Sequence, residues 1–317
     1  MPKKRSRVEN LNEIKREISW EKAVSNFLTW KRAEGRAERT LKDYSYHLAR
    51  FQKLYPDVQL TNDDNLREKL WDYMADDVKP AYYNNKLVYL RTFLNWLVEE
   101  GFLTDNPLKK LKKRKADDRI VRLDADTLKQ LLALPDQKTY SGLRDYALLL
   151  FQIDTGVRPK EALTLLVSDL NLKAYEIRIQ AEHAKTRISR TLPISSITAK
   201  AIHKLIHVRP TDWDDSVTVF CTYEGNDMSV DSWYKRVSFY GSQLGQTIYP
   251  YQLRHTFAIE FLRNGGNAFA LQKAMGHSDM NMTKKYIALA DSDLKEQHLL
   301  ASPISNLVQE KKRIKKI

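Results

Sequence analysis

Cysteine is almost missing from this sequence, since Cys221 is the only one in 317 residues. An internal disulfide is therefore excluded, and a reducing compartment is favoured. Cysteine, histidine and carboxylate residues do not cluster at metal-ligand spacing, so the sequence predicts no metal site. No apolar run approaches the length of a membrane span, and none follows the basic N-terminus as in a signal peptide. We expect a soluble, intracellular protein that does not enter a membrane.

Positive charge is in excess, with 53 Lys and Arg against 40 Asp and Glu and a formal net charge of +13. This balance indicates a polyanionic partner. Nucleic acid is the leading candidate, although charge alone suits an anionic membrane surface equally well. The length predicts two domains rather than one. Residues 1 to 18 form a basic arm, which is either a disordered tail, a DNA contact or a nuclear-import patch.

Residues 19 to 102 have the periodicity of a small helical domain. Apolar positions repeat at helical spacing, Pro80 can open the last helix, and Gly101 can end it. The surface of this domain offers basic, aromatic and amide groups that suit phosphates and base edges, although a solvated charged face explains them equally well. The candidate DNA-binding residues are Arg36, Arg39, Lys42, Tyr82, Tyr83, Asn84 and Lys86.

Residues 103 to 122 are expected to form a linker, because Asn106-Pro107 interrupts regular structure. From Lys109 to Arg122 the segment holds eight Lys or Arg residues against two Asp residues. Such a linker can follow a DNA backbone, so we expect phosphate contacts from its most basic part. These candidates are Lys112, Lys113, Arg114 and Lys115.

The second domain, residues 123 to 295, combines helices with a β-hairpin. Asp124 or Asp126 caps its first helix, and alternating apolar positions at 175–179 and 188–192 predict two paired strands. Residues 217–221 form either a short strand or a buried segment. The predicted fold class is mainly α with a small antiparallel β-sheet, an α+β arrangement.

Two arginines occupy the starts of predicted helices. In the segment 155–159, Gly156 breaks one helix, Pro159 opens the next, and Arg158 projects from the junction with Glu161 one turn inside. Arg254 lies at the start of an apolar helix. Guanidinium groups match phosphate oxygens and stabilise charge that develops on them, although a plain ion pair or helix cap is the common fate of a single arginine.

A histidine and a tyrosine follow. Gly276 ends a helix, so His277 lies just past its C-terminus, and Tyr286 comes nine residues later. A phenol, with a reference pKa of about 10, is a poor nucleophile unless cations surround it and its electrophile is anionic, as a phosphodiester is. His277 also fits a local cap. His255 is left out, because a histidine there is more often a structural hydrogen-bonding residue than a catalyst.

In order and spacing, these motifs resemble the tyrosine recombinases of the phage integrase family. The matching stretches are Thr155 to Leu165, Leu253 to Phe257, and the Gly-His-Ser before the tyrosine. Lys185 lies in the hairpin turn eight residues before Pro193, and so it resembles the acid that protonates the leaving 5′ oxygen. Its competitors are Lys173, Arg187 and Arg190. The resemblance implies site roles for Tyr286, Arg158, Arg254, Lys185, His277, Tyr251 and Glu161.

Two of these roles have a particular character. Glu161 would orient the arginines. Tyr251 departs from the family pattern, which usually has histidine three residues before the second arginine. A tyrosine hydroxyl donates a hydrogen bond to phosphate but does not exchange protons readily near neutral pH. We therefore expect charge stabilisation at this position without general-base help.

The resemblance implies a site-specific DNA recombinase or integrase that cuts and rejoins double-stranded DNA at specific sites through a 3′-phosphotyrosyl intermediate. It implies no cofactor or metal, and integration, excision or resolution of mobile elements as the outcome. A free monomer would form a homotetramer on paired sites, with residues 296 to 317 docking on a neighbouring protomer. Accessory DNA-bending or excisionase proteins would be further partners. The location would be cytoplasmic, at the nucleoid of a prokaryotic cell.

Two alternatives stay open. One is a type IB topoisomerase-like nicking and closing enzyme, which uses the same chemistry on single sites. The other is a DNA-binding regulator that keeps the fold with weakened catalysis. Tyr251 is the only residue that supports the second alternative.

Overall fold

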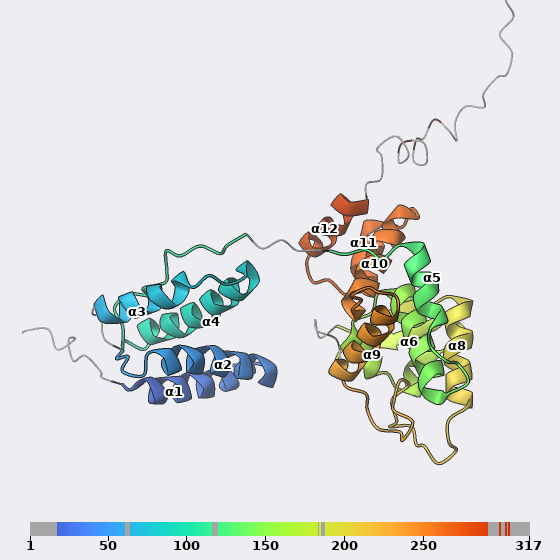
Figure 1. Cartoon of the computed structure of the whole chain (residues 1–317), viewed down its shortest axis with the longest axis horizontal. Coiled ribbons are helices and arrows are strands. Elements are labelled where there is room, and N and C mark those ends of the chain that lie inside the picture. The colour runs from blue at the N-terminus through green and yellow to red at the C-terminus, as the bar shows by residue number, and fades with distance from the viewer. Residues whose placement is uncertain are drawn as a thin grey trace, which may run out of the picture. The chain divides into compact units, whose positions relative to one another are not determined.

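The structure, a computed structural model, describes residues 18–60, 64–115, 120–182, 184, 188–290, 298, 302 and 304. The chain divides into two compact units, the first ending at Asp118 and the second beginning at Arg119 (Figure 1). Most described residues are helical, and one small antiparallel sheet lies in the second unit. The predicted fold class is therefore confirmed.

The described part of the N-terminal unit is built on α1 (Trp20–Ala33), α2 (Glu38–Leu54), α3 (Asp64–Ala75) and α4 (Pro80–Glu99). The hydroxyl of Ser19 caps α1, and Pro80 occupies the first turn of α4, where a missing N–H leaves no hydrogen bond unmade. Aromatic rings fill the centre. The ring of Trp20 lies 5.0 Å from that of Phe51 and 5.2 Å from that of Phe93.

The expected linker belongs in large part to this unit. Leu103 and Leu108 are buried in its core. Asn84 and the backbone of Arg114 exchange two hydrogen bonds of 2.9 Å, and the Arg114 guanidinium lies 3.9 Å from the centroid of the Tyr83 ring. Residues 103–115 are thus packed along the helices, while 116–119 lie outside the described residues.

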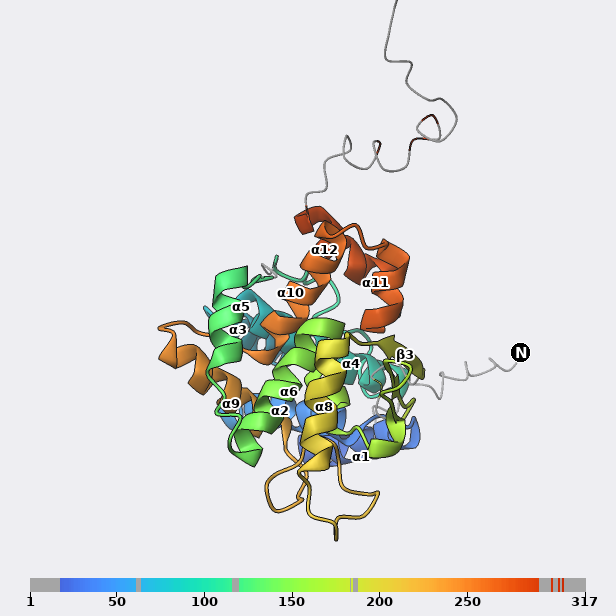
Figure 2. The ribbon, with the colours of Figure 1, turned by 90° about the vertical axis from the view of Figure 1, so that its right-hand side faces the viewer.

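The C-terminal unit contains a larger set of helices. Asp124, rather than Asp126, caps the first of them by accepting a hydrogen bond from the Thr127 N–H. In the second, α6, Leu148 and Phe151 are fully buried, and both α8 and α10 pack against this helix. Figure 2 shows α10, α11 and α12 gathered at one end of the unit, where they contact one another. The described helices are α5 (Ala125–Ala133), α6 (Tyr140–Thr155), α7 (Pro159–Leu163), α8 (Ser196–His207), α9 (Val230–Gln243), α10 (Pro250–Arg263), α11 (Ala268–Met275) and α12 (Met280–Ala290).

The sheet has the order β1-β2-β3, with β1 (Leu170–Asn171), β2 (Glu176–Ile179) and β3 (Arg190–Pro193). Ile177 pairs with Leu192, so the predicted hairpin is present. The sequence did not predict β1, because two residues are too few to show an alternating pattern. Residues 219–221 are fully buried without forming a strand. Among the helices described, none has the length and apolar content to cross a membrane.

Candidate active site

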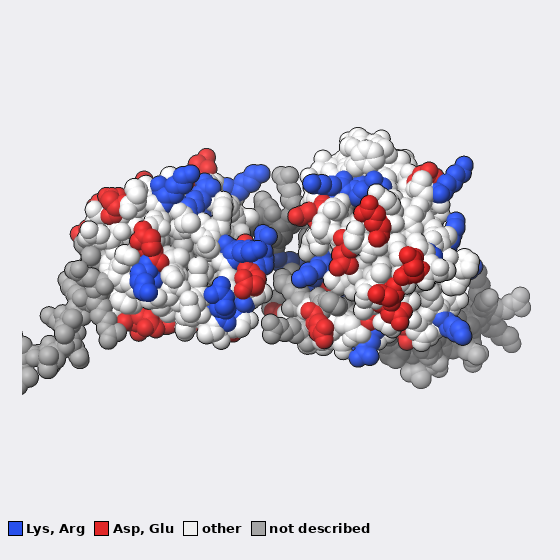
Figure 3. Space-filling view, turned by 90° about the horizontal axis from the view of Figure 1, so that it is seen from below, with Lys and Arg blue, Asp and Glu red and all other residues white. Residues whose placement is uncertain are grey.

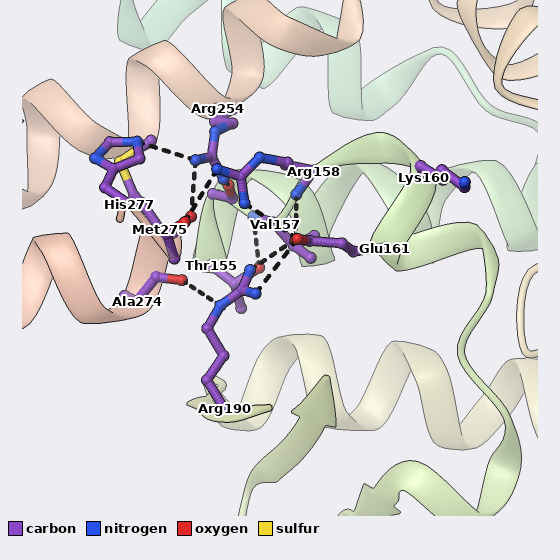
Figure 4. A network of polar contacts seen from close by, with 12 residues as sticks. Thr155, Val157, Arg158, Lys160, Glu161, Arg190, Arg254, Ala274, Met275 and His277 are labelled. Carbon is purple, nitrogen blue, oxygen red and sulfur yellow. Dashed lines mark hydrogen bonds and ion pairs between the residues drawn. The ribbon is translucent and has the colours of Figure 1, made fainter. Parts of the chain in front are cut away.

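Three helix ends meet in the C-terminal unit: the start of α7, the first turns of α10 and the end of α11 (Figure 4). Gly156 and Gly276 make the two turns that close this arrangement, with φ of 61° and 60°. A Cβ on Gly156 would lie 2.2 Å from the Phe257 ring, and one on Gly276 would lie 2.9 Å from Nη1 of Arg190. Glycine is therefore needed at both turns for conformation and for space.

Arg254 is buried and joins two of these helix ends. Its Nη1 donates to the Gly156 oxygen at 2.5 Å, and its Nη2 donates to the Met275 oxygen at 2.8 Å. Burial, and then repulsion by Arg158, lower the pKa of Arg254 to about 9, so the group stays charged near neutral pH. An anion that enters the site would stabilise the charged form of this buried guanidinium further.

Glu161 is the carboxylate around which the arginines are arranged. It is 2% exposed and accepts hydrogen bonds from the Arg158 backbone N–H at 3.2 Å and from Arg158 Nη1 at 3.1 Å. Arg190 Nη2 donates to it at 2.7 Å. Burial alone would raise the pKa of Glu161, but the hydrogen bond and charge of Arg190, with the charge of Arg158, hold it below its usual value. Glu161 is therefore ionised near neutral pH.

Arg190 lies in the candidate site, although the sequence did not predict a role there for it beyond that of an alternative to Lys185. The structure buries it and places its Nε 2.9 Å from the Ala274 oxygen. A signal was present, because Arg190 and Leu192 are two residues apart on one strand and share its inward face. Lys185 and Arg187 lie outside the described residues, and Lys173 is exposed.

His277 is held between Arg254 and α12. Its Nε2 lies 3.1 Å from Arg254 Nη2, and its Nδ1 lies 2.9 Å from Thr283 Oγ1. Because arginine only donates, Nε2 must accept, and the ring proton is assigned to Nδ1, which donates to Thr283. Burial, followed by the charges of Arg254 and Arg158, lowers the pKa of His277 to about 4. The imidazole is therefore neutral.

Tyr286 lies on the buried face of α12 and is 4% exposed. Its ring is stacked on His277, with 6.1 Å between centroids and 6° between planes. Burial raises the pKa of its hydroxyl, while the charges of Arg254 and Arg158 act in the opposite direction. The hydroxyl also lies 2.8 Å from Nδ1 of His255, a contact that sequence reasoning missed. Its only signal was the position of His255 directly after Arg254.

Tyr251 lies at the rim of the site. It is 49% exposed in the first turn of α10, one helical turn before Arg254. Tyr249 precedes it by two positions and stacks on Tyr234, with 4.7 Å between ring centroids. Within the described residues, no hydrogen bond joins Tyr251 to the arginines, and about half of the residue is open to a ligand. The described residues also include no group of three or more His, Cys, Asp and Glu that fits a metal ion.

The expected DNA-binding residues of the N-terminal unit divide by burial. Lys86 is 0% exposed, donates to the Tyr73 oxygen and lies 2.9 Å from Asp76 Oδ2, and Tyr83 is also buried. These two residues belong to the core, so their side chains offer little surface for the DNA contact that was expected of them. Tyr82 and Asn84 are partly buried, and Asn84 holds Arg114. The exposed candidates are Arg36, Arg39, Lys42, Lys112, Lys113 and Lys115.

The surface has mixed charge on the face that Figure 3 presents, where Lys and Arg alternate with Asp and Glu. Two of the exposed candidates already have acidic partners. Arg36 Nε lies 3.2 Å from Glu34 Oε2, and Arg39 Nε lies 3.2 Å from Asp43 Oδ1. Exposed pairs of this kind contribute little stability, so both arginines can exchange their partner for a phosphate.

Comparison with known proteins gives one family and consistent relatives. A family model described as "Phage integrase family" matches residues 121–293. Tyrosine recombinase XerC of Proteus mirabilis is 26% identical over 291 residues, which cover 89% of this chain and 94% of the relative. Tyrosine recombinase XerD of Lacticaseibacillus casei is 26% identical over 288 residues, which cover 88% and 96%.

Solved structures are similar in fold. A lambda integrase dimer bound to a COC′ core site matches with a TM-score of 0.70 at 16% identity, covering 86% of this chain and 78% of that one. The Tn1549 transposon integrase in complex with transposon right end DNA matches with a TM-score of 0.69 at 16% identity, covering 89% and 99%. At such identities the likeness concerns the fold alone.

Proposed function

The chain belongs to the phage integrase family, and from this premise we propose which of its residues cut DNA and how they act. The protein is a site-specific DNA recombinase of the tyrosine type, and DNA is its partner. The following assignments concern the individual residues, the assembly and the biological outcome.

Tyr286 is the proposed nucleophile. Its hydroxyl oxygen attacks a scissile phosphate, forms a 3′-phosphotyrosyl bond and releases a 5′-hydroxyl. That hydroxyl, or one from a partner duplex, then attacks the phosphotyrosine and rejoins the strand. Because the energy of the phosphodiester is kept in the covalent intermediate, this sequence of steps needs no cofactor. Lys185, outside the described residues, is the proposed acid for the leaving 5′ oxygen.

The observation that carries the proposal is the charge around Tyr286. The site contains three guanidinium groups and one carboxylate: Arg158 and Arg190 contact Glu161, while Arg254 is held by the backbone oxygens of Gly156 and Met275. The site therefore holds an excess of positive charge, from two buried arginines and one partly buried arginine, beside a buried phenol. Fixed donors in a low-dielectric site stabilise the charge that develops on phosphoryl oxygens. Arg158 and Arg254 are the proposed phosphate-binding residues, Glu161 and Arg190 position Arg158, and His277 and Tyr251 are proposed further donors.

Cleavage of a suicide duplex tests the proposal. Duplexes cut from DNA that flanks the gene, each with a nick near the candidate site, would trap a covalent adduct because the short 5′ product diffuses away. We expect an adduct that resists detergent and maps to Tyr286 by mass spectrometry. Tyr286→Phe should bind DNA and form no adduct. Tyr249→Phe is the matched control, and an adduct that survives Tyr286→Phe would refute the assignment.

The proposal also covers the assembly of the protein on DNA and the biological outcome of the reaction. Recombination joins two duplexes through four strand cleavages, so we infer a homotetramer on paired sites that forms from monomers, with residues 296–317 docked on a neighbouring protomer. The proposed outcome is integration, excision or resolution of a DNA element in the cytoplasm of a prokaryotic cell, with accessory DNA-bending or excisionase proteins setting direction. Relaxation of supercoiled plasmid without site pairing would instead favour a type IB topoisomerase-like activity.

A further inference from the structure

Two histidines flank the proposed nucleophile in different ways. The rings of His255 and Tyr286 are inclined by 39° with centroids 5.7 Å apart, and Nδ1 of His255 lies 2.8 Å from the phenol oxygen. His277 instead lies parallel to the Tyr286 ring, at 6°. His255 therefore contacts the oxygen that reacts, while His277 contacts the aromatic face.

The reacting oxygen must lose a proton when it bonds to phosphorus. A phenol with a reference pKa of about 10 is ionised in about one molecule per thousand near neutral pH. Burial raises the pKa of Tyr286 further, against the opposing charges of Arg254 and Arg158. A base within hydrogen-bond reach removes this limitation and typically accelerates a proton transfer by about 10²- to 10⁴-fold. The site therefore needs a group that can accept the phenol proton of Tyr286.

Among the residues that the structure describes, the other polar neighbours Arg254, Arg158 and His277 are unsuited to this task. Arginine side chains only donate, which excludes Arg254 and Arg158. His277 accepts from Arg254 at Nε2 and donates to Thr283 from Nδ1, so both of its nitrogens are engaged. His255 remains, and it is held in place because α10, which carries it, packs against α12, which carries Tyr286.

We propose that His255 is the general base for Tyr286, an inference that rests on the proposed recombinase function. As the bond between the Tyr286 oxygen and phosphorus forms, the phenol proton moves to Nδ1 of His255. The bond from phosphorus to the 5′ oxygen breaks, and that oxygen takes its proton from the acid, proposed as Lys185. In the rejoining step the 5′-hydroxyl attacks phosphorus and gives its proton to the deprotonated acid, proposed as Lys185. The bond from phosphorus to the tyrosyl oxygen breaks, and His255 returns the proton to that oxygen.

The charged groups near His255 and Tyr286 favour a base that can release its proton again in the rejoining step. Arg254 precedes His255 on α10, Arg158 lies at the start of α7, and Lys285 precedes Tyr286 on α12. Neutral His277 covers the Tyr286 ring. Neighbouring cations disfavour a second positive charge, whereas a bound phosphate favours it.

A first test measures the tautomers without DNA. In the ¹⁵N NMR spectrum of the full chain, His255 should carry its proton on Nε2 and leave Nδ1 as an acceptor, whereas His277 should carry its proton on Nδ1. His255→Gln and His277→Gln assign the two sets of signals. A proton on Nδ1 of His255 in the free protein would overturn the proposal, whatever the enzyme does to DNA.

A second test separates proton transfer from positioning. His255→Asn places an amide oxygen near the site of Nδ1, so it keeps a hydrogen-bond acceptor but cannot take a proton. On the duplex that yields the Tyr286 adduct, we expect this variant to bind DNA normally and to cleave at least about 10²-fold more slowly. The wild-type rate should fall toward acid between about pH 5 and 8, and this decrease should disappear in the variant.

A more acidic phenol at position 286 should restore cleavage by His255→Asn, because such a phenol loses its proton more readily without a base. A fluorinated tyrosine at position 286 has a more acidic phenol, and it should recover much of the rate of His255→Asn but little of that of His277→Gln. Wild-type cleavage by His255→Asn, or no rescue by the fluorinated residue, would contradict the proposal. Absence of any adduct with the unaltered enzyme would contradict the recombinase assignment instead, and the NMR result would still decide where the proton lies.

Discussion

Arg190 and Glu161, 29 residues apart in the sequence, form a buried ion pair with 2.7 Å between Nη2 and Oε2. The pair connects the inward face of β3 to the start of α7, and Arg190 also reaches the end of α11 through the Ala274 oxygen. One side chain thus ties together the strand, the Arg158 turn and the segment before His277. The geometry of the candidate site therefore depends on Arg190, a residue that is itself buried.

Removing Arg190 should damage the fold and the site together. Arg190→Met leaves Glu161 buried with one fewer partner, and breaking a buried pair typically costs about 3 to 5 kcal/mol. We expect a loss of this size in the free energy of unfolding, measured by urea denaturation, together with slower cleavage. Arg178→Met, at an exposed position of β2, is the matched control. Equal losses in both variants would show that the buried pair has no special role.

Glu161 should make stability depend on pH in a definite direction. Its pKa is lowered in the folded protein, so the unfolded chain takes up the proton first as the pH falls. The stabilisation is therefore complete above the ordinary carboxyl range of about 4 to 5 and is lost as the pH falls through the folded pKa. Unfolding free energies of Glu161→Gln should change less on acidification than those of wild type. Glu176→Gln, at an exposed strand position, should follow wild type.

Local signals in the sequence located Arg158 and Arg254 because glycine and proline mark the helix starts that carry them. The contact of His255 with Tyr286 could not be predicted from the position of His255 beside Arg254, since it exists only where α10 packs on α12. Lys86 shows a different limit of prediction from the sequence. Its spacing from Leu90 places it on the apolar face of α4, but its charge suggested a surface position. The structure resolves the conflict by pairing its ammonium with Asp76.

The basic stretch after α4 should contribute to DNA binding unevenly. Lys112, Lys113 and Lys115 are exposed, whereas Arg114 packs on Tyr83 and bonds to Asn84. Each phosphate contact changes the slope of log affinity against log salt by about 0.9. Replacing the three lysines with Ala should therefore flatten that slope by up to about 3 without changing stability. Arg114→Ala should instead destabilise the N-terminal unit. An unchanged slope in the triple variant would exclude phosphate contacts by these lysines.

The segment after α12 should be needed for pairing and not for binding. Its apolar residues Leu299, Leu300 and Leu307 lie outside the described residues, and Ile304 is 60% exposed. A chain truncated after Asp293 should bind a single site with unchanged affinity and fail to form paired complexes on native gels. Replacing only the basic residues after Lys311 with Gln is the control for charge. Normal pairing by the truncated chain would refute docking between protomers.

Tyr251 and Tyr286 should respond differently to loss of a hydroxyl. Tyr286 is buried beside the arginines, whereas Tyr251 is half exposed one turn before Arg254. If Tyr251 donates a hydrogen bond to the phosphate, Tyr251→Phe should slow cleavage by about 10- to 1000-fold, the range for one lost transition-state donor. Its affinity for DNA should change little, because the arginines remain.

Tyr251→His should stay active, since an imidazole also donates to phosphate from this position. Tyr249→Phe controls for loss of a hydroxyl nearby, because Tyr249 stacks on Tyr234. Rates are measured on the suicide duplex in single turnover, and the attachment site is mapped by mass spectrometry. The adduct should remain on Tyr286 in all three variants. An adduct on Tyr251, or a wild-type rate for Tyr251→Phe, would remove Tyr251 from the phosphate-binding set.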